Sequence, residues 1–382
     1  MVDPPMNTPA HDPGAGCHDP GVAGIRTAQV VVPCADLAAT LDELTGLGFL
    51  VDLVMPADAP TMAIVSGHDV TLRLEQAAAG DRAPSITLRL ACAGDPPRPS
   101  STQASGAIRF EFVPADAPIE IPPSQQQFVL TQATGEHAWH VGRAGMQYRD
   151  LIPGRLGGRF IASHIRIPEG GDVPDYVHYH RIRFQMIYCR SGWARLVYED
   201  QGDPFLFHAG DCVLQPPEIR HRVLETSAAF EVVEIGCPAV HETYADHRLE
   251  LPTGRTLPDR VYGSQRFVHH VAAEARWRPW HDDAREPGFE ARDTGIAAAT
   301  RGLAGARVVR ATRRGAATSV LRHDGEFLFL FVLRGGLDLG SEVFGEHALA
   351  DADACVIPAA VDFRITARRD LELLEVALPG QR

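Results

Sequence analysis

Two histidines one residue apart, His178 and His180, have the spacing of a metal site, and His221 follows 41 positions after His180. On a β-strand, residues i and i+2 point to the same face, so this pair would present two imidazoles side by side. A third imidazole from a neighbouring strand would complete a facial set, and imidazole is the commonest metal ligand in proteins. The three histidines therefore predict a site for a borderline metal such as iron, zinc, nickel or copper.

The residues around these histidines follow two motifs with regular spacing. The first runs Gly171, six residues, His178, one residue, His180, four residues, Gln185, six residues and Gly192. The second runs Gly210, five residues, Pro216, Pro217, Glu218, two residues and His221. Both resemble the motifs of cupins, whose fold is a jelly-roll β-barrel. Two positions depart from the family pattern, because Gln185 replaces a glutamate and Glu218 replaces a glycine.

The resemblance implies that His178, His180 and His221 bind one divalent metal ion and that Gln185 occupies the place of a fourth ligand. An amide in place of a carboxylate removes one negative charge. The ion then keeps its full charge, which should strengthen its attraction for anionic, chelating substrates. Gln185 could still ligate through its carbonyl oxygen or orient a bound water. Three-histidine cupins include iron(II) dioxygenases, so we expect Fe(II), with zinc, manganese and nickel as alternatives.

Three further residues are candidates for catalysis or substrate binding. In the strand-like segment 161–167, His164 and Arg166 share one face. If that face is the barrel interior, His164 could act as a general acid or base and Arg166 could clamp a substrate carboxylate. If it faces solvent, neither has such a role. Arg183 shares its parity with Gln185 and is another anion-binding candidate.

The second half of the chain contains an internal repeat. Five pairs of identical residues lie 143 positions apart: Arg149 and Arg292, Asp150 and Asp293, His180 and His323, Gly192 and Gly335, Cys212 and Cys355. This predicts two tandem β-rich domains, and the resemblance makes them a bicupin. In the second copy, Leu321, Leu328 and Arg364 stand opposite His178, Gln185 and His221. We therefore expect the second copy to bind no metal.

The N-terminal part has a different pattern. Residues 27–35 predict a strand, Asp36 is a plausible N-cap for a helix over 37–48, and three short strands follow. This βαβββ order resembles one module of the vicinal-oxygen-chelate family. Its first strand offers no ligand and Glu75 stands alone, so we expect a structural module, a lid or an interface. The predicted domains are a disordered tail (1–24), this module (25–113), a metal-binding cupin (137–250) and a second cupin (265–380).

Composition excludes several classes of function. The net charge of −13 argues against nucleic acid as a partner, because phosphate binding needs a basic surface. All 36 basic residues are arginine, which excludes Schiff-base lysine chemistry and the P-loop lysine. The cysteines form no regular framework, which indicates a reducing compartment. No apolar stretch approaches the ~18 residues of a membrane span. We therefore expect a cytoplasmic protein without a membrane partner.

Together these features predict a mainly β protein, two tandem jelly-roll barrels preceded by a small α+β module. The predicted function is that of an Fe(II) dioxygenase acting with O₂ on a small anionic chelating substrate: a diketone, a catechol-like ring, a hydroxy or keto acid, or a thiol. Two alternatives stay open. One is a metal-dependent isomerase or lyase that needs no O₂, with His164 as the proton shuttle. The other is a sensor that binds a small ligand without turnover. We also expect a homodimer.

Overall fold

The computed structural model describes residues 25–34, 36–46, 48–67, 70–77, 86–94, 108–133, 139–142, 145–280 and 288–379. The chain divides into two compact units, residues 1–32 with 82–118 and residues 33–81 with 119–382. In the smaller unit, strand β5 (Ile86–Cys92) pairs in parallel with β6 (Ile108–Pro114) and antiparallel with β1 (Ile25–Cys34). The larger unit holds both barrels, and every site discussed below lies within it.

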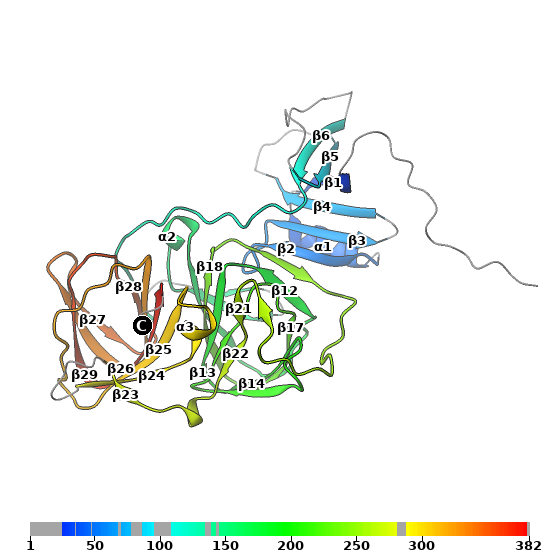
Figure 1. Cartoon of the computed structure of the whole chain (residues 1–382). Coiled ribbons are helices and arrows are strands. Elements are labelled where there is room, and N and C mark those ends of the chain that lie inside the picture. Colours follow the sequence, from blue (N-terminus) through cyan, green and yellow to red (C-terminus); the bar gives the residue numbers. More distant parts are fainter. Residues whose placement is uncertain are drawn as a thin grey trace, which may run out of the picture. The chain divides into compact units, whose positions relative to one another are not determined.

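The first barrel consists of two antiparallel sheets, drawn mostly in green in Figure 1. One sheet has the order β15-β14-β17-β12-β19, with strands at Phe205–His208, Trp193–Tyr198, His221–Thr226, His178–Arg181 and Glu242–Ala245. A short strand, β11 (Gly171–Asp172), also pairs with β17. The other has the order β22-β16-β13-β18-β10-β9-β8, with strands at Val268–His270, Cys212–Leu214, Phe184–Ser191, Phe230–Cys237, Ile161–Ile167, Gln147–Asp150 and His140–Val141. Two facing antiparallel sheets form the predicted jelly roll.

The second barrel is formed by a single sheet with two long strands, coloured mostly yellow to red in Figure 1. Its strands follow the order β23-β24-β25-β29-β26-β28-β7, at Arg278–Pro279, Phe289–Asp293, Gly305–Ala311, Arg364–Leu378, Phe327–Ser341, Ala354–Val356 and Val129–Thr131. Strand β27 (Gly345–Ala350) pairs with β26. Strand β7 precedes the first barrel in sequence but pairs with β28 of the second. The prediction of a mainly β chain with tandem barrels is confirmed.

The internal repeat is visible strand by strand. Strand β26 begins at Phe327, 143 residues after Phe184 begins β13, and it covers the equivalents of both β13 and β14. The glycines at the two equivalent bends, Gly192 and Gly335, have φ values of 72° and 84°. A Cβ at either position would come within 2.3 Å of Ser227 Oγ or Asp370 O, so the bend requires glycine.

The interior of the second barrel is filled by apolar side chains. Leu328, which stands at the position equivalent to Gln185, is buried in a core cluster with Leu330, Leu337 and Leu339. His323 lies within hydrogen-bonding distance of the backbone, with Nε2 2.9 Å from the carbonyl oxygen of Ile357. Apolar packing thus surrounds the position that corresponds to Gln185 of the first barrel.

The N-terminal elements lie where the pattern predicts them. Helix α1 (Leu37–Gly46) is capped by Asp36, whose Oδ1 accepts the amide hydrogen of Ala39 at 3.0 Å. Strands β2 (Leu50–Met55), β3 (Met62–Gly67) and β4 (Val70–Gln76) follow as an antiparallel meander. Strand β2 then pairs with β19, so β2, β3 and β4 extend a sheet of the first barrel. The predicted module at 25–113 therefore contributes to both compact units. The predicted tail at 1–24 lies outside the described residues.

Among the described helices, none combines the length and the hydropathy that crossing a membrane requires.

Candidate metal centre

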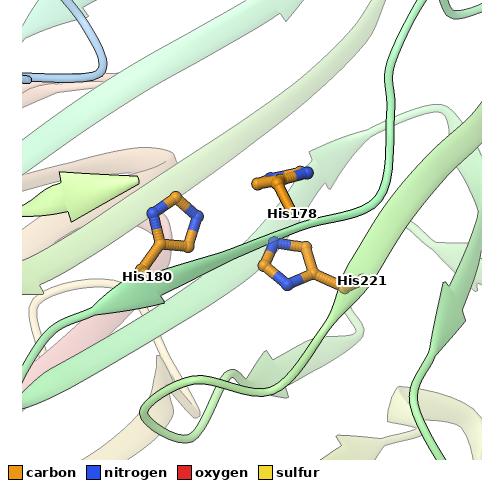
Figure 2. Close-up of side chains that lie close together, drawn as sticks. All are labelled: His178, His180 and His221. Atoms are coloured by element: carbon orange, nitrogen blue, oxygen red, sulfur yellow. The ribbon is translucent and has the colours of Figure 1, made fainter. Parts of the chain in front are cut away.

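His178, His180 and His221 converge inside the first barrel. His178 and His180 lie two residues apart on β12. His178 pairs with His221, the first residue of the neighbouring strand β17. One ligand atom of each histidine lies within 4.8 Å of the others. The ring centroids of His178 and His221 are 4.2 Å apart, and those of His180 and His221 are 5.3 Å apart. Figure 2 shows the three rings gathered at one point from two strands.

The hydrogen bonds behind these rings select one nitrogen of each as the candidate ligand. Nδ1 of His178 lies 2.8 Å from the carbonyl oxygen of Tyr176, and Nδ1 of His221 lies 2.9 Å from that of Ile219. A carbonyl only accepts, so in both rings Nδ1 carries the hydrogen and Nε2 keeps its lone pair. Nδ1 of His180 lies 2.9 Å from the hydroxyl of Thr243. This donor set fits a metal ion, because ligating histidines characteristically donate their other nitrogen in this way.

The three imidazoles have little access to bulk solvent. His178, His180 and His221 are 1%, 7% and 5% exposed. Buried Asp175 links the segment just before β12 to β17, because its Oδ1 accepts the amide of Tyr176 at 3.0 Å and its Oδ2 accepts that of Val223 at 3.0 Å. The geometry of the three rings is therefore held by the barrel itself.

A cavity of about 110 Å³ lies beside the histidines. Its walls are mainly apolar and come from both sheets, with Ile161, Ile165, Ile187, Leu196, Phe230 and Val232 among the lining residues. Its polar lining includes Gln185, Gln215 and Glu234 next to the three histidines. An apolar cavity with a few convergent polar groups is the usual form of a small-molecule site.

Gln185 lines this cavity from β13 and is 1% exposed. Its Nε2 donates to Glu234 Oε1 at 2.6 Å, and its Oε1 accepts from Gln215 Nε2 at 3.2 Å. Gln185 therefore lines the same cavity as the three histidines. Glu234 was not singled out from the sequence. The signal was present, because this glutamate shares the parity of the apolar residues Phe230 and Val232 along the strand.

The predicted roles of His164 and Arg166 are wrong. The residues of β10 that line the cavity are Ile161, Ser163, Ile165 and Ile167, and the alternate residues face the opposite side. His164 is buried there, with Nε2 2.9 Å from Glu231 Oε2 and Nδ1 3.0 Å from Arg149 Nη2. Arg166 donates to Gln147 Oε1 at 2.7 Å and stacks over Trp139. The apolar face of the strand, and not the charged one, turns toward the cavity.

The predicted role of Arg183 is also wrong. This residue precedes the first residue of β13, and its Nη1 donates to Glu326 Oε1 at 2.8 Å. Arg159 of the first barrel forms an ion pair with the same carboxylate. Arg183 is absent from the lining of the cavity and instead links the two barrels. The prediction assumed that Arg183 and Gln185 lie on one strand and therefore share a face. Strand β13 begins only at Phe184, so this alternation does not extend to Arg183.

Two further lining residues were missed by sequence reasoning. His241 lies beside His180, with ring centroids 5.3 Å apart, and its Nδ1 lies 3.2 Å from the carbonyl oxygen of Pro238. Burial lowers the pKa of His241 below its ordinary value, which favours the neutral imidazole. Asp58 reaches the cavity from the loop between β2 and β3 and forms an ion pair with Arg155 of helix α2 (Arg155–Gly158). No local motif marks either residue, because separate segments bring both to the site.

Comparison with known proteins gives matches among solved structures only. No family model matches the chain, and no curated protein does. Salicylate 1,2-dioxygenase from Pseudaminobacter salicylatoxidans is 16% identical over 67% of this chain and 86% of its own, with a TM-score of 0.49. Oxalate decarboxylase from Bacillus subtilis is 12% identical over 68% and 78%, with a TM-score of 0.48. The protein Ylba from E. coli is 10% identical over 67% and 93%, with a TM-score of 0.46.

The chain's own features define its architecture. Each barrel is built from antiparallel strands in jelly-roll order, the strands recur 143 residues apart, and the two glycine–histidine motifs converge on one point in the first barrel. The chain therefore has two jelly-roll barrels in tandem, and the three histidines of the cupin-like motifs meet inside the first of them.

Proposed function

We propose that this protein is a metal-dependent cupin enzyme, an Fe(II) dioxygenase acting on a small chelating anion. The observation that supports this most directly is the convergence of three imidazoles whose Nδ1 atoms are all engaged behind the site. Their Nε2 atoms would hold one divalent ion, for which zinc, manganese or nickel are the alternatives to iron. When bound, the ion would supply a Lewis-acidic centre with open positions for a chelating substrate and O₂.

The cavity limits the kind of substrate. Its apolar walls suit an aliphatic or aromatic body, and its volume of about 110 Å³ suits a small molecule. Arg166 and Arg183, the two predicted anion clamps, do not line it, whereas Arg222 does. Attraction for an anionic group would therefore come from the metal ion and Arg222. The candidate substrate is an acid or enolate with two adjacent oxygen ligands and a compact apolar body.

A second candidate function is supported by Glu234 and His241. Both side chains line the cavity, and the pKa of His241 lies below its ordinary value because the imidazole is buried. A carboxylate and a neutral imidazole beside a metal could move a proton on a bound substrate without O₂. This is the chemistry of a metal-dependent isomerase or lyase, and His241 and Glu234 would replace His164 as its proton carriers.

Metal analysis combined with O₂ uptake separates these functions. The full chain is purified without added metal, its metal content is measured, and O₂ consumption is followed with a panel of small chelating acids. Iron with substrate-dependent O₂ uptake supports the dioxygenase. Zinc or manganese with turnover that needs no O₂ supports the isomerase or lyase. Ligand binding without turnover under either condition would contradict both and leave the sensor.

Two variants test the assignment of the site itself. His178→Ala is expected to lose the metal. The matched control is His323→Ala in the second barrel, where a buried histidine outside the three-histidine cluster is removed. This control is expected to retain the metal content of the wild type. Equal metal content in His178→Ala and the wild type would show that the metal lies elsewhere.

We also propose a cytoplasmic homodimer. Light scattering after gel filtration would measure the mass directly, for comparison with the 41.5 kDa of one chain. A mass of one chain across the concentration range would contradict the dimer.

A further inference from the structure

Four side chains next to the histidines form a hydrogen-bonded chain. The hydroxyl of Tyr198 donates to Gln215 Oε1 at 2.7 Å. Gln215 Nε2 then donates to Gln185 Oε1 at 3.2 Å, and Gln185 Nε2 donates to Glu234 Oε1 at 2.6 Å. The same Gln215 Nε2 lies 3.2 Å from Nε2 of His221. The chain thus runs past the candidate metal ligands and ends on a carboxylate.

The carboxylate end of this chain determines its direction. A carboxylate oxygen accepts, and the group of Gln185 that faces Glu234 is the amide nitrogen, which donates to Oε1 at 2.6 Å. At the other end, the hydroxyl of Tyr198 donates to Gln215 Oε1. Both amides are therefore oriented, and neither can flip without placing two donors or two acceptors together.

This direction decides which atom of Gln185 faces the histidines. Its Nε2 points to Glu234, so its Oε1 points to the opposite side, toward Gln215 Nε2. That nitrogen lies within 3.2 Å of both Gln185 Oε1 and His221 Nε2, so the amide oxygen is on the histidine side. A carbonyl oxygen can bind a divalent ion or a bound water, whereas an amide nitrogen cannot accept in this way.

We propose that Glu234 is a positioning residue that holds the amide of Gln185 with its oxygen toward the metal centre. In the cupin motif, the fourth ligand is a glutamate and carries a negative charge. Here Gln185 takes that position, and the carboxylate belongs to Glu234 on β18, which accepts a hydrogen bond from Gln185. The pairing of β13 with β18 brings this about, because Ile187 lies opposite Glu234 and Gln185 lies opposite Gly236. This role rests on the proposed metal site.

Cobalt(II) titration of the metal-free full chain tests the role by affinity and by visible spectrum, without recourse to turnover. Glu234→Gln keeps the size of the side chain but can both donate and accept, so Gln185 loses its fixed orientation. We expect Co(II) to bind about tenfold more weakly, with a changed spectrum, since partners behind a ligand typically contribute 10–100-fold to affinity.

The exchanged pair, Gln185→Glu with Glu234→Gln, provides the rescue. In this pair the amide at position 234 donates to the carboxylate at position 185, so one donor and one acceptor again face each other. The carboxylate now lies toward the metal, so we expect Co(II) to bind at least as tightly as in the wild type. Glu231→Gln is the matched control, because it makes the same change on the same strand at a residue absent from the cavity lining. This control is expected to keep the wild-type affinity and spectrum.

The outcomes separate the role of Glu234 from the metal site. Wild-type affinity and spectrum in Glu234→Gln would overturn the positioning role and leave the metal site intact. The same conclusion follows if the exchanged pair binds no better than the single variant, because the loss would then be a general structural one. A wild-type chain that fails to bind Co(II) would overturn the metal site and this role together.

Discussion

The hydroxyl of Thr243 lies 2.9 Å from Nδ1 of His180, on the side of the ring that faces away from the metal centre. Thr243 also pairs with Val54 of β2 in the sheet. Thr243 of β19 therefore connects the candidate ligand His180 to the meander formed by β2, β3 and β4. The sequence predicted a separate module here, but only strand β19 separates β2 from the strand that carries His178 and His180.

We expect Thr243→Val to weaken metal binding about tenfold, because it removes the hydrogen-bond partner of a ligand without changing side-chain size. Isothermal titration with Co(II) measures this directly. Thr294→Val is the matched control, since Thr294 is also buried and its hydroxyl donates to the carbonyl oxygen of Ala306 in the second barrel. Equal losses of affinity in the two variants would mean that Thr243 acts only through stability.

Metal removal should lower the thermal stability of the wild type. A ligand that binds only the folded state stabilises it by about 2.7 kcal/mol at a free concentration 100 times its Kd. Calorimetry with and without a chelator would show this as a fall in Tm. His178→Ala should unfold at one temperature under both conditions. A chelator effect of equal size in that variant would place the stabilising metal elsewhere.

The ion pair between Asp58 and Arg155 should slow the exit of metal. Asp58 lies in the loop that lines the cavity, and Arg155 anchors this loop to helix α2. Asp58→Asn removes the charge that holds the two together, so a chelating dye should strip the metal several-fold faster. Asp52→Asn, the same change on β2 at a residue absent from the cavity lining, should release metal at the wild-type rate. Wild-type release from Asp58→Asn would mean that this loop does not control access.

The acid stability of the protein should depend on Glu231. Its hydrogen bond to His164 and the nearby Arg190 lower the pKa of this carboxyl to about 2. The folded state therefore loses stability as the pH falls from the ordinary carboxyl range, near 4.5, toward 2. His164 acts in the same direction, because burial lowers its pKa and acidification then favours the unfolded state.

Glu231→Gln tests this dependence. The variant should lose roughly 3 kcal/mol of unfolding free energy at neutral pH, the value of a shift of this size. The difference from the wild type should shrink as the pH approaches 2. Denaturant titrations at several pH values measure both effects. The control Glu225→Gln breaks an exposed pair with Arg195 and should change stability by less than about 1 kcal/mol. A pH-independent loss in Glu231→Gln would contradict the pKa assignment.

Features with a short repeat were predictable from the chain alone. The period of two along a strand places His178 and His180 on one face, and a helix N-cap has a local sequence signal at Asp36. The constant spacing of 143 residues predicted two copies of one barrel, and β13 and β26 begin at that spacing. The same alternation left β10 ambiguous, because it separates two faces of a strand without showing which one is inside.

The sequence by itself determined the three histidines, the tandem barrels and the replacement of glutamate by Gln185. Each depends on spacing within a short segment or on a repeat along the chain. Only the tertiary structure decided that Glu234 faces Gln185, that β2 joins the sheet of the histidines, and that His164 and Arg166 point away from the cavity. The physical reason is that these relationships depend on strand pairing and sheet packing between distant segments. Local periodicity does not specify which segments pair or in which register.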